Sequence, residues 1–324
     1  MDTWVNQLHA RASIVHGQIA ASLSIIRSLD SESSKLIDQE VALRPLYDLL
    51  RKLYAEDLPL AKVRDTSDIV IHAEGPAAVG EAMQLRAVNW LSAKVKQQLT
   101  LLAAAALPQN GDTSVIARKF QWNVTGLVPG SIFMGFALDR PAMESPFEMT
   151  DNIAFDAIVT AAQAIPVVPR FVDDNGVAPE LLDELDDPAV RDAAMFAAMR
   201  LAPTDSSGLV TVEISAPTGE HGVLGQRERI VLRESLRSPL MRKKIEGTFV
   251  GEVREVDLDA GRFQLRGVQG VGTLRCAMPF NNEQAAGWLG KGVKVSGVYE
   301  TDHNGRPRLM RVESIDVVRQ LNLI

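Results

Sequence analysis

The C-terminal stretch of residues 245–315 constrains the fold of this chain more than any other part of the sequence. Its apolar residues recur at every second position in short runs, which is the period of half-buried β-strands. In the run 247–256, for example, Phe249 and Val253 fall on one face and Val250 on the other. Turn-forming clusters of glycine, asparagine and aspartate separate the runs. We therefore expect three strands, a short helix and two further strands.

This order of elements resembles the oligonucleotide/oligosaccharide-binding (OB) fold, a five-stranded Greek-key β-barrel. An SH3-like barrel is the alternative, because strand number alone separates small barrels poorly. A helix between the third and fourth strands, capped by Asn281 or Asn282 and ended at Gly290, favours the OB-like fold. The resemblance is a pattern over less than a quarter of the chain, so it assigns no functional residue.

The remaining sequence predicts an α+β protein in several parts. Apolar residues at steps of three and four over residues 4–29 and 35–54 predict two helices that form an antiparallel hairpin. Strands and helices do not alternate regularly after that, which favours a mainly antiparallel sheet over a doubly wound fold. We expect the following parts: a helical hairpin at 1–60, a mixed α/β body at 61–236, a basic linker at 237–244 and an OB-like β-barrel at 245–318.

Three local predictions concern helix boundaries. Pro45 is expected to kink or restart the second helix of the hairpin. One long helix is expected over about 77–107, and another over 179–201, with Pro179 in its first turn.

Length and composition limit the cellular setting. The chain has 324 residues, which suggests at least two domains. Its longest apolar run, residues 99–107, is shorter than a membrane helix, and the N-terminus lacks the pattern of a signal peptide. We therefore expect a cytoplasmic protein without membrane contact. The single cysteine, Cys276, excludes an intrachain disulfide and a cysteine-based zinc site.

The sequence contains no recognisable catalytic or metal-binding pattern. The five histidines share no metal-ligand spacing, and we expect His72, at the end of a strand, to be structural. Ser131 follows a Pro-Gly pair in a turn and does not stand in a nucleophile elbow. Carboxylates are dense over residues 173–192, which predicts a solvated acidic helix face or a docking patch for a basic partner. We predict no catalytic residue, no metal and no cofactor.

Charge is distributed unevenly along the chain, whose formal net charge is −7. Residues 1–240 hold 21 Lys and Arg against 31 Asp and Glu, whereas residues 241–324 hold 13 against 10. Only the C-terminal part is therefore suited to a polyanion. The candidate binding residues are the outward arginines of the second and third strands, two lysines near the fourth strand and the basic linker: Arg262, Arg266, Arg275, Lys291, Lys294, Arg242, Lys243 and Lys244.

Two functions compete on these grounds. The first is a non-catalytic cytoplasmic binding or scaffold protein, an oligomer or a subunit of a larger assembly, with its helices and C-terminal barrel as contact surfaces. The alternative is single-stranded nucleic-acid binding through the arginine-bearing face of the barrel. That face lacks the aromatic residues on which bases usually stack, although arginine can stack on bases itself. We therefore favour a protein partner or self-association over nucleic acid.

Overall fold

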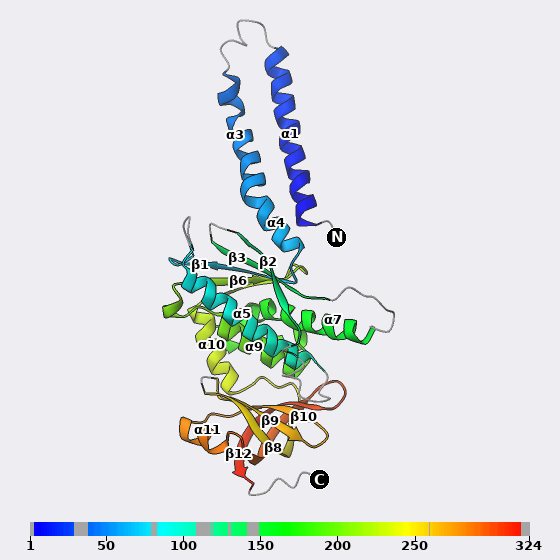
Figure 1. The fold of residues 1–324 in the computed structure, drawn as a ribbon, viewed down its shortest axis with the longest axis vertical. Helices are drawn as coiled ribbons and strands as arrows, with labels where there is room; N and C mark the ends of the chain where they lie inside the picture. Colours follow the sequence, from blue (N-terminus) through cyan, green and yellow to red (C-terminus); the bar gives the residue numbers. More distant parts are fainter. Residues whose placement is uncertain are drawn as a thin grey trace.

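The computed structural model describes residues 3–28, 38–78, 83–107, 117, 119–128, 131–140, 149–258 and 260–318. The molecule is elongated, with a helical hairpin at one end, a sheet covered by helices in the middle and a second sheet at the C-terminal end (Figure 1). The predicted mixture of helix and sheet is confirmed. The predicted domain boundaries remain predictions.

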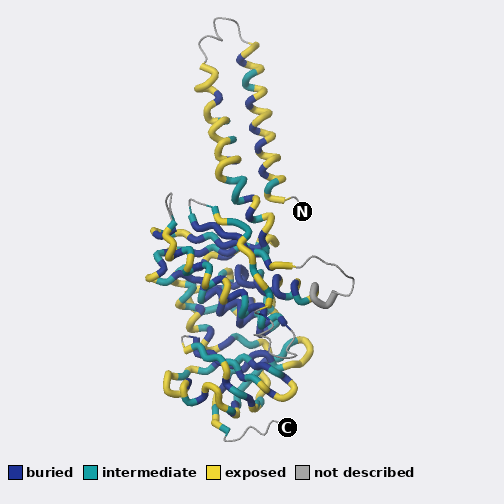
Figure 2. Tube along the Cα trace, in the orientation of Figure 1, coloured by how far each residue is buried: buried dark blue, intermediate teal, exposed yellow. Residues whose placement is uncertain are grey.

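The hairpin consists of one long helix packed against a segmented one. Its elements are α1 (Trp4–Ser28), α3 (Gln39–Lys52), a π-helical turn (Leu53–Asp57) and α4 (Leu58–Asp65). A single stripe of α1 is buried, formed by Leu8, Ala12, Val15, Ile19 and Ile26. Most of the remaining hairpin surface is exposed (Figure 2). Pro45 lies inside α3, which continues without interruption, so the expected restart of the helix at this residue is wrong. The irregular turn occurs instead eight residues later.

The body is built on a five-stranded sheet in the order β2-β3-β1-β6-β7, in which all neighbouring strands are antiparallel. The strands are β1 (Ile69–Glu74), β2 (Trp122–Val128), β3 (Ile132–Leu138), β6 (Thr211–Ser215) and β7 (His221–Leu224). One face, with Ile69 and Ile71, contributes to the main core beneath the helices. The opposite face packs Val70 and Phe133 against Val63 of α4, which seats the hairpin on the sheet.

The other body elements cover the core face of this sheet or connect its strands. They are α5 (Leu85–Ala106), α7 (Met149–Gln163), a 3-10 helix (Ile165–Phe171), the small hairpin of β4 (Val172–Asp173) and β5 (Gly176–Val177), α8 (Leu181–Glu184), α9 (Pro188–Leu201), a 3-10 turn (Asp205–Ser207) and α10 (Gln226–Arg237).

Helix α9 is the central helix of the body, since twelve of its fourteen residues are buried. Asp187 caps it by accepting hydrogen bonds from the backbone N–H groups of Ala189 and Val190, and Pro188 occupies the first turn. This cap divides the helix expected over 179–201 into α8 and α9. The helix expected over 77–107 is also shorter, because α5 begins at Leu85; residues 79–82 of that prediction lie outside the described residues.

The C-terminal part of the chain forms a five-stranded sheet with one helix, and these elements follow in the predicted order. These are β8 (Ile245–Asp257), β9 (Arg262–Val268), β10 (Gly272–Ala277), α11 (Asn282–Trp288), β11 (Gly292–Thr301) and β12 (Pro307–Val317). The strands pair in the closed cycle β10-β12-β11-β8-β9, in which only β10 and β12 are parallel. Phe263, Leu265, Val293 and Val295 belong to the core inside this cycle. Asn281 caps α11, as one of the two predicted alternatives requires.

Gly135 lies at a close contact between the hairpin and the body sheet. A Cβ atom at this residue of β3 would lie within 3.0 Å of the side chains of Ser67, Thr125 and Val63. The absence of a side chain at residue 135 therefore allows α4 to rest on the sheet.

We predict that Gly135→Ala lowers the free energy of unfolding by about 1–3 kcal/mol, because the added methyl group overpacks this contact. The midpoint of urea unfolding measures the change. Gly287→Ala is the matched control, since a Cβ atom at that position of α11 meets no atom within 4 Å. It should leave the midpoint unchanged or raise it. Equal midpoints for the two variants would contradict the close packing of α4 on β3.

Candidate functional site

Two of the predicted binding residues face the body of the protein instead of solvent. Arg262 of β9 donates from Nη2 to Asp192 Oδ1 at 2.6 Å, and Arg275 of β10 donates from Nε to Asp192 Oδ2 at 3.1 Å. The side chain of Asp192 is 2% exposed, and that of Arg262 is 9% exposed. Both arginines point out of their own sheet, but α9 of the same chain covers this side, so neither presents an open face to solvent.

The charge of Asp192 is stabilised by its two partners. Burial by itself raises the pKa of this carboxyl, but the charges and hydrogen bonds of Arg262 and Arg275 outweigh that effect and hold the pKa below its usual value. Burial also lowers the pKa of Arg262, against the attraction of Asp192. Asp192 is thus ionised at neutral pH, and one carboxylate neutralises part of the charge of two guanidinium groups.

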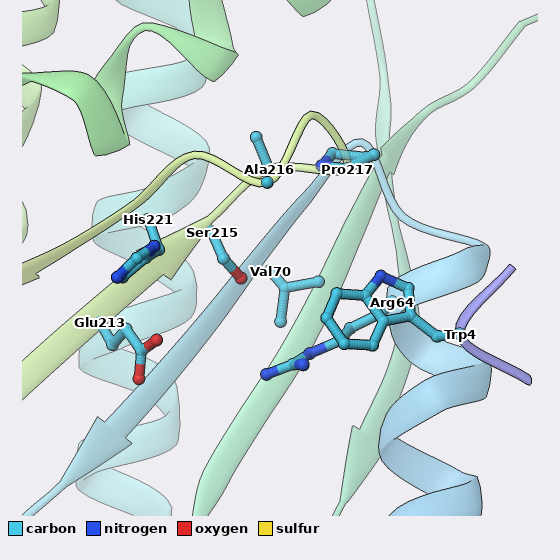
Figure 3. Close-up of a pocket in the computed structure, with 9 residues that line it drawn as sticks. Trp4, Arg64, Val70, Glu213, Ser215, Ala216, Pro217 and His221 are labelled. Atoms are coloured by element: carbon cyan, nitrogen blue, oxygen red, sulfur yellow. The ribbon is translucent and has the colours of Figure 1, made fainter. Parts of the chain in front are cut away.

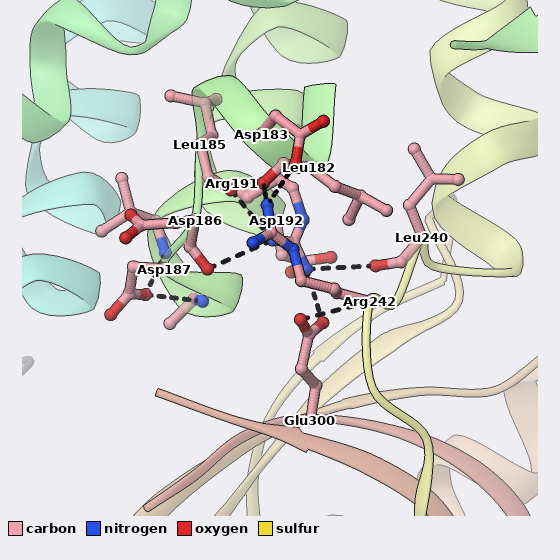
Figure 4. Close-up of polar contacts among 12 residues, drawn as sticks. Leu182, Asp183, Leu185, Asp186, Asp187, Arg191, Asp192, Leu240, Arg242 and Glu300 are labelled. Carbon is pink, nitrogen blue, oxygen red and sulfur yellow. Dashed lines mark hydrogen bonds and ion pairs between the residues drawn. The ribbon is translucent and has the colours of Figure 1, made fainter. Parts of the chain in front are cut away.

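A second buried ion pair lies beside the first, and here α9 contributes the basic residue and the C-terminal sheet the acidic one. Arg191 of α9 donates from Nη2 to Glu300 Oε2 of β11 at 2.5 Å, and both side chains are at most 5% exposed. The same guanidinium also donates to the carbonyl groups of Leu185 at 2.9 Å and Leu240 at 3.3 Å (Figure 4). Glu300 in turn accepts from the backbone N–H of Arg242. Adjacent residues of α9 therefore bind acidic and basic side chains of the C-terminal sheet.

The acidic segment 173–192 is not a uniformly solvated face. Asp192 is buried in the interface, Asp187 caps α9, and Asp183 accepts a hydrogen bond from Arg242 at 2.8 Å. The sequence left two alternatives for this segment, a solvated acidic helix face and a docking patch for a basic partner. Part of the segment is a docking patch, but the basic partner is the C-terminal part of the same chain. Two further contacts join the body to the C-terminal sheet: Arg200 binds Asp257, and Arg308 donates to the carbonyl of Ala105.

The other predicted binding residues lie outside this interface or at its edge. Arg266 is half-buried and lies 3.1 Å from Glu255 on the neighbouring strand. Arg242 is exposed but bound to Asp183. The four lysines of the set are exposed, and none has an ion pair within 4.0 Å among the described residues: Lys243, Lys244, Lys291 and Lys294. The structure therefore separates the covered arginines from these exposed lysines.

His72 and Ser131, two residues interpreted as structural, lie together on the outer face of the body sheet. His72 Nε2 is 2.8 Å from Ser131 Oγ, and its Nδ1 is 3.5 Å from Glu213 Oε2 on the adjacent strand. The second distance exceeds a normal hydrogen bond. Glu74 also approaches Nε2, at 3.7 Å. These contacts describe a cross-strand polar cluster. Sequence spacing did not indicate it, because Ser131 and Glu213 are far from His72 and Glu74 of β1 in the sequence.

The described residues contain no group of three or more His, Cys, Asp or Glu side chains arranged to hold a metal ion. Cys276 is buried in the core of the C-terminal sheet, and burial raises the pKa of its thiol far above the usual range. The thiol is therefore protonated and unreactive at neutral pH.

One helical segment within the described part of the chain, Ile153–Phe171, has the length and mean hydropathy of 1.2 that a membrane span would need. Of this segment 56% is buried within the protein, as is common for a core helix. Length and composition alone are weak evidence for a span.

No model of a known protein family matches this chain, and no curated protein matches it. Among solved structures, the hypothetical protein ygiW from E. coli is similar to 26% of this chain and 85% of its own length, at 19% sequence identity. The TM-score of that match is 0.18. At this value the similarity carries no argument about the function of the chain.

We predict that Asp192→Asn lowers the free energy of unfolding by about 3–5 kcal/mol, because it leaves two guanidinium groups without their buried counter-charge. Urea unfolding of the full chain measures the loss. Asp183→Asn is the control, since the side chain of Asp183 is 82% exposed and its pair with Arg242 should contribute less than about 1 kcal/mol. Similar losses for the two variants would show that the Asp192 contacts do not stabilise the interface.

Proposed function

We propose that this chain is a non-catalytic binding or scaffold protein that assembles into an oligomer through its helical hairpin. The observation that carries the proposal is the uncovered apolar surface of the hairpin, which projects from the body on one side of the molecule (Figures 1 and 2). A cytoplasmic location is part of the proposal, as the sequence predicts.

Several large apolar side chains of the hairpin are exposed. Ile14 and Ile25 of α1 are 64% and 63% exposed, and Val41 of α3 is 57% exposed. Further exposed apolar residues follow on the second arm: Tyr47, Leu49 and Tyr54. Of the 25 residues of α1, only Arg11 and Arg27 carry a formal charge. A partner can thus cover this helix while desolvating few charges.

We propose a second copy of the chain as the partner. Two hairpins that pack face to face form a four-helix bundle, in which each hairpin covers the apolar surface of the other. A helix of 25 residues is about 37 Å long, and two helices side by side are about 20 Å wide. One face of the hairpin therefore offers on the order of 700 Å² per copy, close to the ~800 Å² of a standard stable interface.

The C-terminal sheet is proposed to be an OB-like barrel. Its closed strand cycle, the parallel pairing of β10 with β12 and the helix between the third and fourth strands support this fold. Its β9–β10 side is occupied by α9. We propose that its other surfaces are available to partners in the assembly.

We predict that light scattering at micromolar protein concentration gives a molar mass of at least twice the 35.3 kDa of one chain. The double variant Ile14→Glu/Ile25→Glu should shift the mass toward the monomer, because it places two charges in the proposed bundle interface. Leu85→Glu/Ile153→Glu is the matched control, since these residues are also exposed, at 72% and 69%, but lie on other helices. A monomeric unmodified protein, or equal masses for both variants, would refute hairpin association.

The alternative function, single-stranded nucleic-acid binding, is favoured by one observation. Four exposed lysines without ion-pair partners among the described residues lie within residues 241–324, which hold 13 Lys and Arg against 10 Asp and Glu. Of the eight predicted binding residues, these lysines are the ones to test for nucleic-acid binding, because α9 covers Arg262 and Arg275.

This alternative predicts that changing Lys243, Lys244, Lys291 and Lys294 to Ala weakens the binding of an oligothymidylate. Each lost phosphate contact should also reduce the slope of log affinity against log salt by about 0.7. Fluorescence anisotropy at several salt concentrations measures both quantities. Lys62→Ala/Lys96→Ala is the control, because these exposed lysines lie outside the C-terminal sheet. Unchanged affinity and slope in the fourfold variant would exclude this surface.

A further inference from the structure

A pocket of about 250 Å³ lies where the hairpin joins the outer face of the body sheet (Figure 3). Trp4 of α1 and Arg64 of α4 line it from the hairpin side. Glu213 and Ser215 of β6 and His221 of β7 line it from the sheet side. Its walls therefore come from segments that are far apart in the sequence.

The hairpin side of the pocket is held in place by the start of α1. The carboxylate of Asp65 accepts hydrogen bonds from the backbone N–H groups of Trp4 at 2.8 Å and Val5 at 2.9 Å. A carboxylate at a helix N-terminus is favoured by the unpaired N–H groups and the helix dipole. This contact fixes the first turn of α1 against α4, so the Trp4 indole stays beside Arg64.

Arg64 is oriented by aromatic rings and has no charged partner among the described residues. Its guanidinium carbon is 4.6 Å from the centroid of the Trp4 ring and 5.7 Å from that of Phe133. Its Nε is buried without a hydrogen-bond partner, and no described carboxylate lies within 4.0 Å of its guanidinium nitrogens. Stacking thus holds the planar group while its hydrogen-bonding edge is left for another acceptor.

Glu213 supplies the opposite charge on the other side of the pocket. Its carboxylate and the Arg64 guanidinium point toward the same space beside Val70 from opposite sides, and they do not pair with each other (Figure 3). Ser215 directs its hydroxyl group into the region between them. The pocket therefore has a cationic end, an anionic end and a hydroxyl group between the two.

We propose that this pocket binds a small zwitterion of the α-amino-acid type. The carboxylate of the ligand binds Arg64, its ammonium group binds Glu213, and its apolar side chain packs against the Trp4 indole, which is 43% exposed. This site goes beyond the proposed self-association and does not depend on it.

Ligands with only one charge fit this pocket less well. A simple carboxylate would satisfy Arg64 but would lie near the like charge of Glu213, whereas a simple amine would lie near the like charge of Arg64. The volume is below the 300–1,000 Å³ that pockets for drug-sized ligands occupy, which limits the ligand to a small molecule. A ligand here contacts α1, α4 and the sheet together, so it links the hairpin to the body.

The test is a calorimetric titration of the full-length protein with L-leucine, L-methionine and L-phenylalanine. We expect at least one of them to bind with a Kd below about 1 mM. For L-leucine, two analogues each remove one charge: 4-methylpentanoate lacks the ammonium group, and 3-methylbutylamine lacks the carboxylate. For whichever amino acid binds, the two corresponding single-charge analogues should bind at least about tenfold more weakly than that amino acid. Each analogue loses one charged hydrogen bond.

Arg64→Met and Glu213→Gln should each weaken binding of that amino acid by at least about tenfold. The same changes in a partly exposed ion pair of the C-terminal sheet, Arg254→Met and Glu252→Gln, are the matched controls and should leave the Kd unchanged. The urea midpoint of each variant shows whether it is folded.

Three results would overturn the proposal. The first is no binding of any of the three amino acids at about 10 mM. The second is a single-charge analogue that binds as tightly as its parent amino acid. The third is a folded Arg64→Met or Glu213→Gln variant with an unchanged Kd.

Discussion

The arrangement of the body and the C-terminal sheet depends on two buried ion pairs at the start of α9. Arg191 and Asp192 are adjacent, carry opposite charges and bind oppositely charged residues of the C-terminal sheet. Burying such charges costs several kcal/mol per ion, so paired charges add little net stability compared with a well-packed apolar contact. Their effect is on orientation, because a rotated or shifted sheet would leave these charges buried without partners. We infer that the pairs select one docking geometry.

This docking geometry determines which surfaces remain for function. The β9–β10 side of the C-terminal sheet, which carries Arg262 and Arg275, is covered by the body of the same chain. Four lysines, Lys243, Lys244, Lys291 and Lys294, remain exposed, as does most of the hairpin at the other end of the molecule (Figure 2). The pocket between Arg64 and Glu213 lies at the base of the hairpin. A ligand there and a partner on the hairpin would thus act on the same helices.

The sequence predicts local structure well where neighbouring residues determine it. The strands of the C-terminal sheet and the helix α11 follow from period-2 alternation and from glycine and asparagine at the turns. The broken helix at residues 185–187 was missed, although Asp187 followed by Pro188 is a local start signal for a helix. The interface could not be predicted in this way. Asp192 is 70 residues from Arg262 and 83 from Arg275, and alternation shows only that the arginines point out of their own sheet.

The central claim is that Asp192 and the arginines of the C-terminal sheet form one coupled unit across the interface. A double-mutant cycle with Asp192→Asn and Arg262→Gln in the full chain, followed by urea unfolding, measures this coupling most directly. We predict an interaction energy of at least about 1.5 kcal/mol, because Asp192→Asn leaves the Arg262 guanidinium buried without its counter-charge, and the double change removes that guanidinium. Effects that add within about 0.5 kcal/mol would contradict the claim and show that the two residues act independently.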